Sequence, residues 1–371
     1  MKAAVTIIRV LTGLLFIFSG LVKAIDPLGL AYKMQEFFEA WGQTSSLRPL
    51  MNALDGYAVG FSIIMITLEV VVGVALLLGW QKKLTAWILV LLMLFFTFLT
   101  SYVLFTGKIR ACGCFGDCIP LTPMQTFTKD IVLLLFAFFL LFNTEYISPV
   151  AKPLVNSLLV LTAAILTLLL QFHVMKHLPL ADCLPFKKGN NILELRKMPA
   201  DAIPDKTDFI FYYEKDGVKK EFSSANLPDS TWKYKERKDI IIKGKNNIPL
   251  INDFSLTTEE GGDATESILN EPGEYYLFFV KELPDNTDKW LNEFKALSEK
   301  AVTMKRSMFI VTSQKNVVAD FMEKNKITIE GVLTCDVTAI KTAARANPTL
   351  YLMKGPVIQG KWSWADLDEA K

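Results

Sequence analysis

Apolar residues form five long runs in the first half of the chain, and short mixed runs occupy the second half. A membrane core about 30 Å thick requires roughly 20 apolar residues in helical form, because every backbone amide in lipid must be paired internally. The pattern therefore predicts five transmembrane helices. They cover Val5–Ile25, Tyr57–Trp80, Leu84–Phe105, a shorter segment around Thr126–Phe142, and Pro153–Phe172.

Charged residues interrupt the first and fourth runs. Lys129 and Asp130 open the fourth run and would have to remain at the membrane interface. In the first run, Val22-Lys23-Ala24 loosely fits the small-residue rule of a signal-peptide cleavage site. Because Arg9 breaks the apolar stretch and Lys23 occupies the supposed cleavage site, an uncleaved helix is the better interpretation.

The second half predicts a soluble α/β region. Asp208–Tyr213 and Val218–Phe222 flank a glycine-bearing turn and indicate a hairpin, with a further strand at Asp239–Ile242. From Ile248 onward strands alternate with helices and end in a hairpin, a pattern typical of an α/β domain. The expected strands are Tyr275–Val280, Met308–Thr312, Thr349–Met353 and Pro356–Gln359, and the expected helices are Asp288–Val302, Asn316–Lys324 and Ala339–Ala346.

The fold class expected is thus a membrane all-α helical bundle followed by a soluble α/β domain. We expect a four-helix membrane domain at 1–143, a fifth transmembrane helix at 144–177, a β-rich connecting region at 178–247 and the α/β domain at 248–371. Up to His177 there are 12 Lys+Arg and 8 Asp+Glu, against 28 and 30 in the remainder. Neither part has the basic excess of a nucleic-acid binder.

The number of spans places the loop after the third helix and the soluble domain on one side of the membrane. The short segments on the other side carry Lys2, Lys82, Lys83 and Lys152. The loop side also carries positive residues, spread over longer segments: Lys33, Arg48, Lys108 and Arg110. The positive-inside rule favours a multi-pass protein of the bacterial inner membrane whose C-terminal domain is periplasmic, where disulfides persist.

Three of the five cysteines lie within the seven residues Cys112–Cys118, in the loop between the third and fourth spans. Structural zinc sites usually combine closely spaced cysteine pairs into a set of about four ligands. Here one and three residues separate the cysteines, although Cys183 could be a fourth ligand and His173 and His177 lie near that face. Disulfide chemistry fits the spacing better, so no metal is expected.

Cys112 and Cys114 could be bridged only through a small constrained ring, for which Gly113 gives the backbone freedom. Strained, exposed disulfides tend to be the labile or catalytic ones. Cys118 would resolve a mixed disulfide or pair permanently with Cys183. The inert alternative is that all four cysteines form two structural bridges.

Two further groups of charges bear on this chemistry. Lys108 and Arg110, just upstream of the cysteines, would favour a reactive thiolate. Within the spans, Glu69 lies in the middle of the second, and Arg9, Ser19 and Lys23 lie along the first. Intramembrane ionisable groups are costly and mark functional hypotheses. A Glu69–Arg9 pair would be structural; alternatively, Glu69 would take up or release a proton when a quinone is reduced near the loop.

Several short motifs occur through the first part of the chain. They are Arg9-x-x-x-Gly13, Phe18-Ser19-Gly20-x-x-Lys23, Asp26-Pro27-Leu28-Gly29, Glu69-x-x-x-Gly73 and Cys112-Gly113-Cys114-Phe115-Gly116-Asp117. Together they resemble the DoxX-like and methylamine-utilisation MauE group of redox-associated membrane proteins, as found in Bacteroidota. The resemblance covers Met1–Asn143 and implies a four-helix bundle with a role in disulfide or thiol metabolism, quinone-linked in some relatives. If a quinone is bound, we expect Arg9, Lys23 and Asp117 to contribute to its site.

The order of elements from Ile248 resembles a thioredoxin-like domain of the thiol-disulfide oxidoreductase kind. In that family a cis-proline opens the third core strand, and Pro348 matches its position. The family's Cys-x-x-Cys follows the first core strand, but Lys281–Asp285 contains no cysteine. Because exchange there needs two thiols, we expect a degenerate thioredoxin fold used for docking or scaffolding. Cys335 would then be a buried structural residue.

The leading hypothesis is a periplasm-facing membrane thiol-disulfide oxidoreductase. Its Cys112 and Cys114 would cycle between dithiol and disulfide, with electrons passing to a quinone in the bundle or arriving from another membrane donor. The thioredoxin-like domain would bind a periplasmic thiol or disulfide protein. The alternative is a non-enzymatic, membrane-anchored assembly or maturation factor with structural disulfides, and a metal-handling site is a third possibility.

Overall fold

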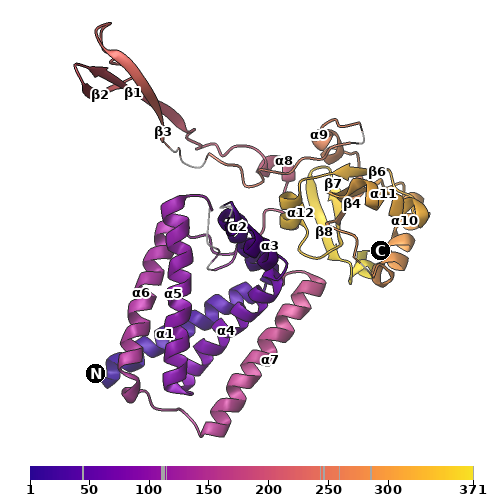
Figure 1. Cartoon of the computed structure of the whole chain (residues 1–371). Coiled ribbons are helices and arrows are strands. Elements are labelled where there is room, and N and C mark those ends of the chain that lie inside the picture. The colour runs from indigo at the N-terminus through magenta and orange to yellow at the C-terminus, as the bar shows by residue number, and fades with distance from the viewer. Residues whose placement is uncertain are drawn as a thin grey trace.

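The computed structural model describes residues 1–43, 46–109, 113, 115–242, 244, 247–258, 260–284 and 286–370. Figure 1 shows a helical bundle from the first half of the chain, an α/β domain beside one end of it, and a β ribbon projecting away from both. The predicted fold class, a membrane helical part followed by a soluble α/β region, is confirmed.

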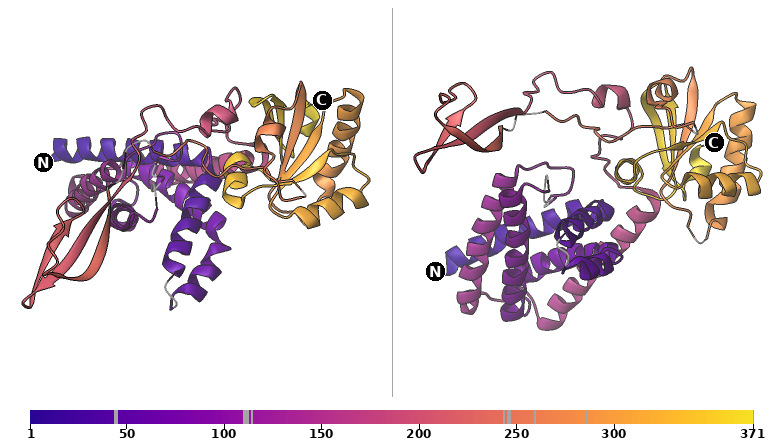
Figure 2. Two further views of the ribbon diagram at one scale, coloured as in Figure 1. Left: turned by 90° about the horizontal axis from the view of Figure 1, so that it is seen from above. Right: turned by 45° about the horizontal axis from the view of Figure 1, so that its top comes forward.

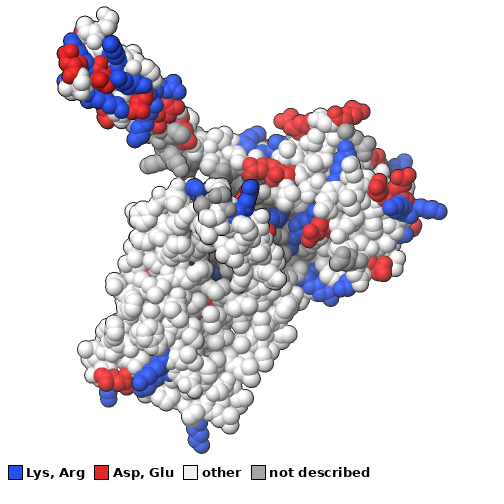
Figure 3. Space-filling model, in the orientation of Figure 1, with Lys and Arg blue, Asp and Glu red and all other residues white. Residues whose placement is uncertain are grey.

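Five helices among the described residues are long and apolar enough to cross a membrane. They are α1 (Lys2–Ala24), α4 (Ala58–Leu78), α5 (Lys82–Thr106), α6 (Pro123–Phe142) and α7 (Pro153–His177). Figure 3 shows that the visible flank of this bundle is nearly free of charge, with Lys, Arg, Asp and Glu gathered toward its ends. Such a surface is expected where lipid surrounds the helices.

Two helices that the hydrophobic pattern did not predict lie between α1 and α4: α2 (Pro27–Gly42) and α3 (Arg48–Asp55). Asp26 caps α2, because its Oδ1 accepts a hydrogen bond from the Gly29 amide at 3.2 Å and Pro27 occupies the first turn. The charged positions in both helices hide them from a search for apolar runs.

Glycines allow α1 and α4 to approach closely. A Cβ atom on Gly73 would lie 2.8 Å from the carbonyl oxygen of Gly13 and 2.9 Å from the amide nitrogen of Ile17. Both neighbours are backbone atoms, which cannot move aside as a flexible side chain would. The bundle therefore depends on a small residue at this crossing.

The connecting region forms a three-stranded antiparallel sheet in the order β2-β1-β3. The predicted hairpin is present as β1 (Lys206–Lys215) and β2 (Val218–Ser223), and the third strand, β3 (Lys233–Ile242), starts earlier than predicted. The right-hand view in Figure 2 shows this ribbon standing apart from the bundle and from the α/β domain.

The C-terminal domain is a five-stranded sheet in the order β6-β5-β4-β7-β8. Strand β4 pairs in parallel with β5 and antiparallel with β7, and β5 pairs in parallel with β6, as a thioredoxin-like fold requires. Its strands are β4 (Glu274–Val280), β5 (Met308–Thr312), β6 (Gly331–Thr334), β7 (Thr349–Lys354) and β8 (Val357–Ser363). Its helices are α9 (Thr265–Leu269), α10 (Asp288–Thr303), α11 (Lys315–Lys324), α12 (Val337–Ala343) and the 3₁₀ helix η2 (Leu367–Ala370). In the membrane part, a short 3₁₀ helix, η1 (Thr144–Tyr146), precedes α7.

Residues from before the ribbon complete the core of this domain. Phe186 and Ile192, the latter at the start of α8 (Ile192–Leu195), are buried with Ile251 and Phe254 against one face of the sheet. The ribbon is therefore inserted within a packing unit that begins soon after α7. The Asn347–Pro348 bond is cis, which confirms the expectation for Pro348.

We predict that Gly73→Ala lowers the free energy of unfolding by about 1–3 kcal/mol, because its methyl group would overpack the α1–α4 crossing. Thermal unfolding of the purified protein in detergent measures the change. Gly60→Ala is the matched control in the same helix, since nothing lies within 4 Å of its added Cβ. Equal melting temperatures for the two variants would contradict this packing.

Candidate functional site

The cysteine loop joins α5 to α6, and Arg110, Cys112 and Cys114 lie outside the described residues. Gly113 and Gly116 have φ angles of +69° and +58°, a backbone conformation that favours glycine. The Gly116 amide donates a hydrogen bond of 2.9 Å to the Gly113 carbonyl. The loop therefore turns tightly just after Gly113.

Side chains from three helices flank this turn. The Phe115 ring lies 6.0 Å from the ring of Phe18 on α1, and the Lys129 ammonium of α6 lies 5.2 Å from the Phe115 centroid. A Cβ on Gly113 would lie 3.4 Å from Cγ of Lys33 on α2. The loop thus rests on the bundle surface.

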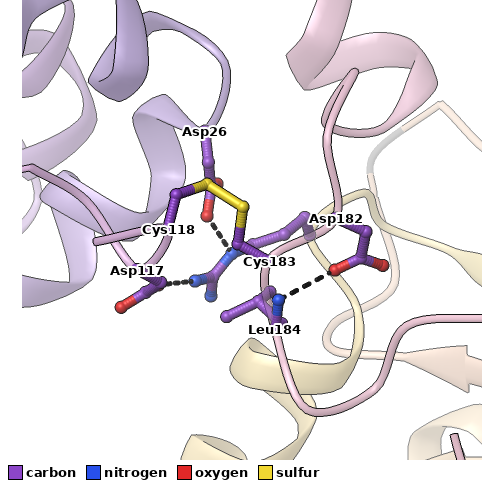
Figure 4. Close-up of a disulfide and its surroundings, with 7 residues drawn as sticks. Asp26, Asp117, Cys118, Asp182, Cys183 and Leu184 are labelled. Atoms are coloured by element: carbon purple, nitrogen blue, oxygen red, sulfur yellow. Dashed lines mark hydrogen bonds and ion pairs between the residues drawn. A yellow bond between two sulfur atoms is a disulfide. The ribbon is translucent and has the colours of Figure 1, made fainter. Parts of the chain in front are cut away.

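A disulfide joins Cys118 of this loop to Cys183, 65 residues later in the segment that follows α7 (Figure 4). Of the two roles predicted for Cys118, the structure contains the pairing with Cys183. The Cys183 segment is also held to the α/β domain, because Asp182 accepts a hydrogen bond of 2.7 Å from Lys361 Nζ on β8. The bridge therefore ties the loop to the base of the soluble domain.

Arg345, which follows α12, connects the soluble domain to both parts of the membrane domain that face it. Its Nε donates to Asp26 Oδ2 at 2.8 Å, and its Nη2 donates to Asp117 Oδ2 at 2.9 Å. The side chain is only 6% exposed. Burial lowers the pKa of Arg345, but the two carboxylates outweigh burial and raise it, so the guanidinium remains charged.

Tyr32 of α2 lies among three cations of the soluble domain. Lys281, Lys341 and Arg345 place their charged groups 5.6, 5.2 and 5.3 Å from its ring centroid. Lys281 Nζ also hydrogen-bonds the Tyr32 hydroxyl at 2.9 Å, and Lys341 Nζ donates to Gln35 at the same distance. Burial raises the pKa of Tyr32, so the phenol stays neutral.

Lys281 stands directly after β4, where the thioredoxin family carries its Cys-x-x-Cys. Burial, with the nearby Arg345 charge, lowers its pKa to about 8. Its backbone amide donates to the Asn347 side chain at 2.9 Å, which ties this position to the loop of the cis-proline, Pro348. The face that would hold a redox site in a thioredoxin-like protein is therefore turned toward the membrane domain.

An open cleft of about 770 Å³ runs beside this interface. Its walls come from α2 and α3 on one side and from α12 on the other, and the Cys118–Cys183 bridge lies in its lining. The contact between the two domains is thus flanked by solvent.

Within the spans, Glu69 pairs with Lys23, so the predicted Glu69–Arg9 pair is wrong. Both partners are buried, and the Lys23 ammonium lies 5.1 Å from the centroid of Phe96. The reason is helix length, since Arg9 and Lys23 are separated by about 21 Å along α1. Arg9 instead donates to the Ser148 carbonyl at 3.0 Å, beyond the far end of the bundle.

The three residues expected at a quinone site are therefore not brought together. Arg9 contacts Ser148, Lys23 pairs with Glu69, and Asp117 pairs with Arg345. The cavity around the Lys23–Glu69 pair has a volume of about 40 Å³. Gly113, between the two loop cysteines, belongs to the lining of that cavity.

Cys335 is 4% exposed, and burial raises its pKa to about 12. Its surroundings are the apolar core on one face of the sheet, as expected of a structural cysteine. His173 stacks on His177, which in turn lies 2.6 Å from Asp366. In the part of the chain that the structure describes, no three His, Cys, Asp or Glu side chains gather as metal ligands would.

Sequence reasoning missed the residues that join the domains: Asp26 as an ion-pair partner, Tyr32, Lys281 as a contact, and Arg345. Asp26-Pro27 was visible as part of a family motif, and its capping pattern was the available signal for α2. No local signal links Arg345 to Asp26, because 319 positions separate them.

Comparisons with known proteins match the helical bundle and the β ribbon separately. Residues 1–143 match the family model of methylamine utilisation protein MauE, which confirms that part of the predicted resemblance, and residues 207–244 match a domain of unknown function (DUF8463). The chain is similar to Protein TlpB of Flavobacterium psychrophilum, with 36% identity over 144 residues. That match spans 37% of this chain and 37% of the relative. No solved structure matches the chain.

We predict that Glu69→Gln destabilises the protein by about 3–5 kcal/mol, because the Lys23 ammonium would remain buried without its partner. The double variant Lys23→Met with Glu69→Leu should recover most of this loss, since apolar side chains can replace a buried pair. Thermal unfolding in detergent compares the two. A double variant no more stable than Glu69→Gln would contradict a structural role of the pair.

Proposed function

We propose that this protein is a membrane-bound thiol-disulfide oxidoreductase in which Cys112 and Cys114 form the exchanging pair. The observation that supports it is the state of the other three cysteines. Cys118 and Cys183 are bonded to each other, and Cys335 is buried with a raised pKa. Because a thiolate is the nucleophile in exchange, the chemistry falls to the two remaining cysteines.

The proposed reaction is exchange with a partner protein. A partner thiolate attacks one sulfur of the Cys112–Cys114 disulfide, that bond breaks, and a mixed disulfide forms. The partner's second thiolate then attacks the mixed disulfide and releases both loop cysteines. Two electrons and two protons pass from the partner to the loop, and the reverse sequence reduces a partner disulfide.

A quinone does not fit the cavity that Lys23 and Glu69 line. The cavity at Lys23 and Glu69, about 40 Å³, is far smaller than the roughly 300 Å³ at which small-molecule sites begin. We therefore derive no step through a quinone, and a second thiol-disulfide partner resets the loop. Since Gly113 and Glu69 line the same cavity, Glu69 is the carboxylate we propose to exchange protons with the loop cysteines.

The full-length protein in detergent, oxidised and mixed with a reduced dicysteine peptide, tests the exchange. We expect about one peptide disulfide per chain in a single turnover. Cys112→Ser combined with Cys114→Ser should lower this yield at least tenfold, whereas Cys335→Ser, the control, should leave it unchanged. Equal yields from the double variant would overturn the proposal and favour a non-enzymatic assembly factor.

We infer further that the loop and the soluble domain face the periplasm of a bacterial inner membrane. The Cys118–Cys183 disulfide supports this orientation, because such bonds persist in oxidising compartments. The segments at the opposite membrane face are short and carry Lys82, Lys83 and Lys152, in keeping with the positive-inside rule.

We predict that a reporter active only in the periplasm, such as alkaline phosphatase, is active when fused after residue 370 and inactive when fused within 143–152. A cytoplasm-dependent fluorescent reporter at the same two sites should give the opposite result. Activity with the positions reversed would contradict the orientation.

A further inference from the structure

The soluble domain meets the membrane domain through one particular face of its thioredoxin-like fold. Lys281 at the end of β4 and Arg345 before the cis-proline make the contacts, and both reach α2 or the cysteine loop. In a redox-active thioredoxin-like protein the segment after the first core strand carries the Cys-x-x-Cys, and in this chain that segment begins at Lys281. A domain without those cysteines therefore still presents its former reaction face to a loop that carries two.

The contacts across this face are polar, and polar contacts can break and re-form as two domains separate and meet. They are hydrogen bonds and ion pairs, from Arg345 to Asp26 and Asp117 and from Lys281 to Tyr32. The cleft of about 770 Å³ beside them lets solvent reach the edge of the contact. Polar contacts are typical of domain interfaces that permit relative motion.

The covalent link lies at the margin of the contact. Cys183 follows α7 closely and is bonded to the loop, so the base of the soluble domain stays in place when the ionic contacts break. His177, the last residue of α7, contacts Asp366 near the same base. The soluble domain is thus attached covalently at its base through Cys183 and by ion pairs at Arg345. We call these ion pairs the latch.

We propose that the surface formed by α2 and Asp117 is a docking surface for a separate thioredoxin-fold protein that carries a Cys-x-x-Cys, and that the chain's own soluble domain covers it as a lid. This rests on the proposed function, because a protein docked there would direct its cysteines toward the loop. Asp26, Asp117 and Tyr32 would receive a basic group beside the partner's cis-proline, as they receive Arg345 here.

Competition between the lid and the partner sets the expected size of the effect. The partner binds only the protein whose lid is open, so its apparent affinity is its affinity for the open form multiplied by the open fraction. If the lid is open about one tenth of the time, opening it fully tightens binding about tenfold.

The test uses the full-length protein and a bacterial thioredoxin with both active-site cysteines replaced by serine, so that binding needs no thiol chemistry. Arg345→Ala combined with Lys281→Ala should lower the dissociation constant at least tenfold relative to the unmodified chain. Arg306→Ala is the matched control, because Arg306 pairs with Glu274 at the opposite end of β4. It should leave the constant within twofold.

A second variant separates opening from misfolding of the soluble domain. Asp117→Asn, added to the Arg345→Ala and Lys281→Ala variant, removes a carboxylate of the docking surface and should raise the dissociation constant again. Binding to apolar surface exposed by misfolding would not depend on Asp117. Equal dissociation constants for all four proteins would overturn the docking surface and its lid. Binding that tightens as expected while the peptide yield stays low would instead count against exchange at Cys112 and Cys114 and leave the docking surface standing.

Discussion

The buried ion contacts of one guanidinium fix the relation between the two halves of this protein. Arg345 spans the gap to Asp26 at the start of α2 and to Asp117 in the cysteine loop. A charge buried to this degree is tolerated only when it is paired, and removing one partner typically costs about 3–5 kcal/mol. Because Asp26 also caps α2, the carboxylate that receives the soluble domain shapes the surface on which it rests.

The contact involves the segment in which the thioredoxin family carries its cysteines. Lys281 begins this segment directly after β4, and its ammonium donates a hydrogen bond to the Tyr32 hydroxyl. A reactive cysteine needs access to a partner and an environment that favours the thiolate, whereas here the position is covered by α2. The fold keeps the geometry of a redox face without its cysteines, and the two cysteines proposed to exchange, Cys112 and Cys114, belong to the loop.

Local patterns predicted most of the architecture, and long-range geometry accounts for what they missed. The five membrane helices and the ribbon hairpin were visible because hydrophobic period and turn residues are local signals. The four-residue strand β6 was missed because so short a run has no distinctive period. Glu69 was matched to Arg9 when Lys23 is its partner, since sequence shows which charges share a helix but not which of them faces the neighbour. Cys118–Cys183 could be foreseen only as one of two alternatives, because spacing alone does not pair cysteines.

The two attachments of the soluble domain respond to different conditions, and this difference gives the fold its capacity to switch. The disulfide at Cys183 depends on the redox state of the compartment, and in an oxidising one it is permanent on the timescale of domain motion. The latch at Arg345 depends on charge pairing and can be displaced by any partner that supplies an equivalent cation to Asp26 and Asp117. Since the disulfide keeps the displaced domain close by, the latch closes again as an intramolecular event at high effective concentration. A competing partner must therefore bind both carboxylates and the Tyr32 surface together, which favours a folded domain over a small cation.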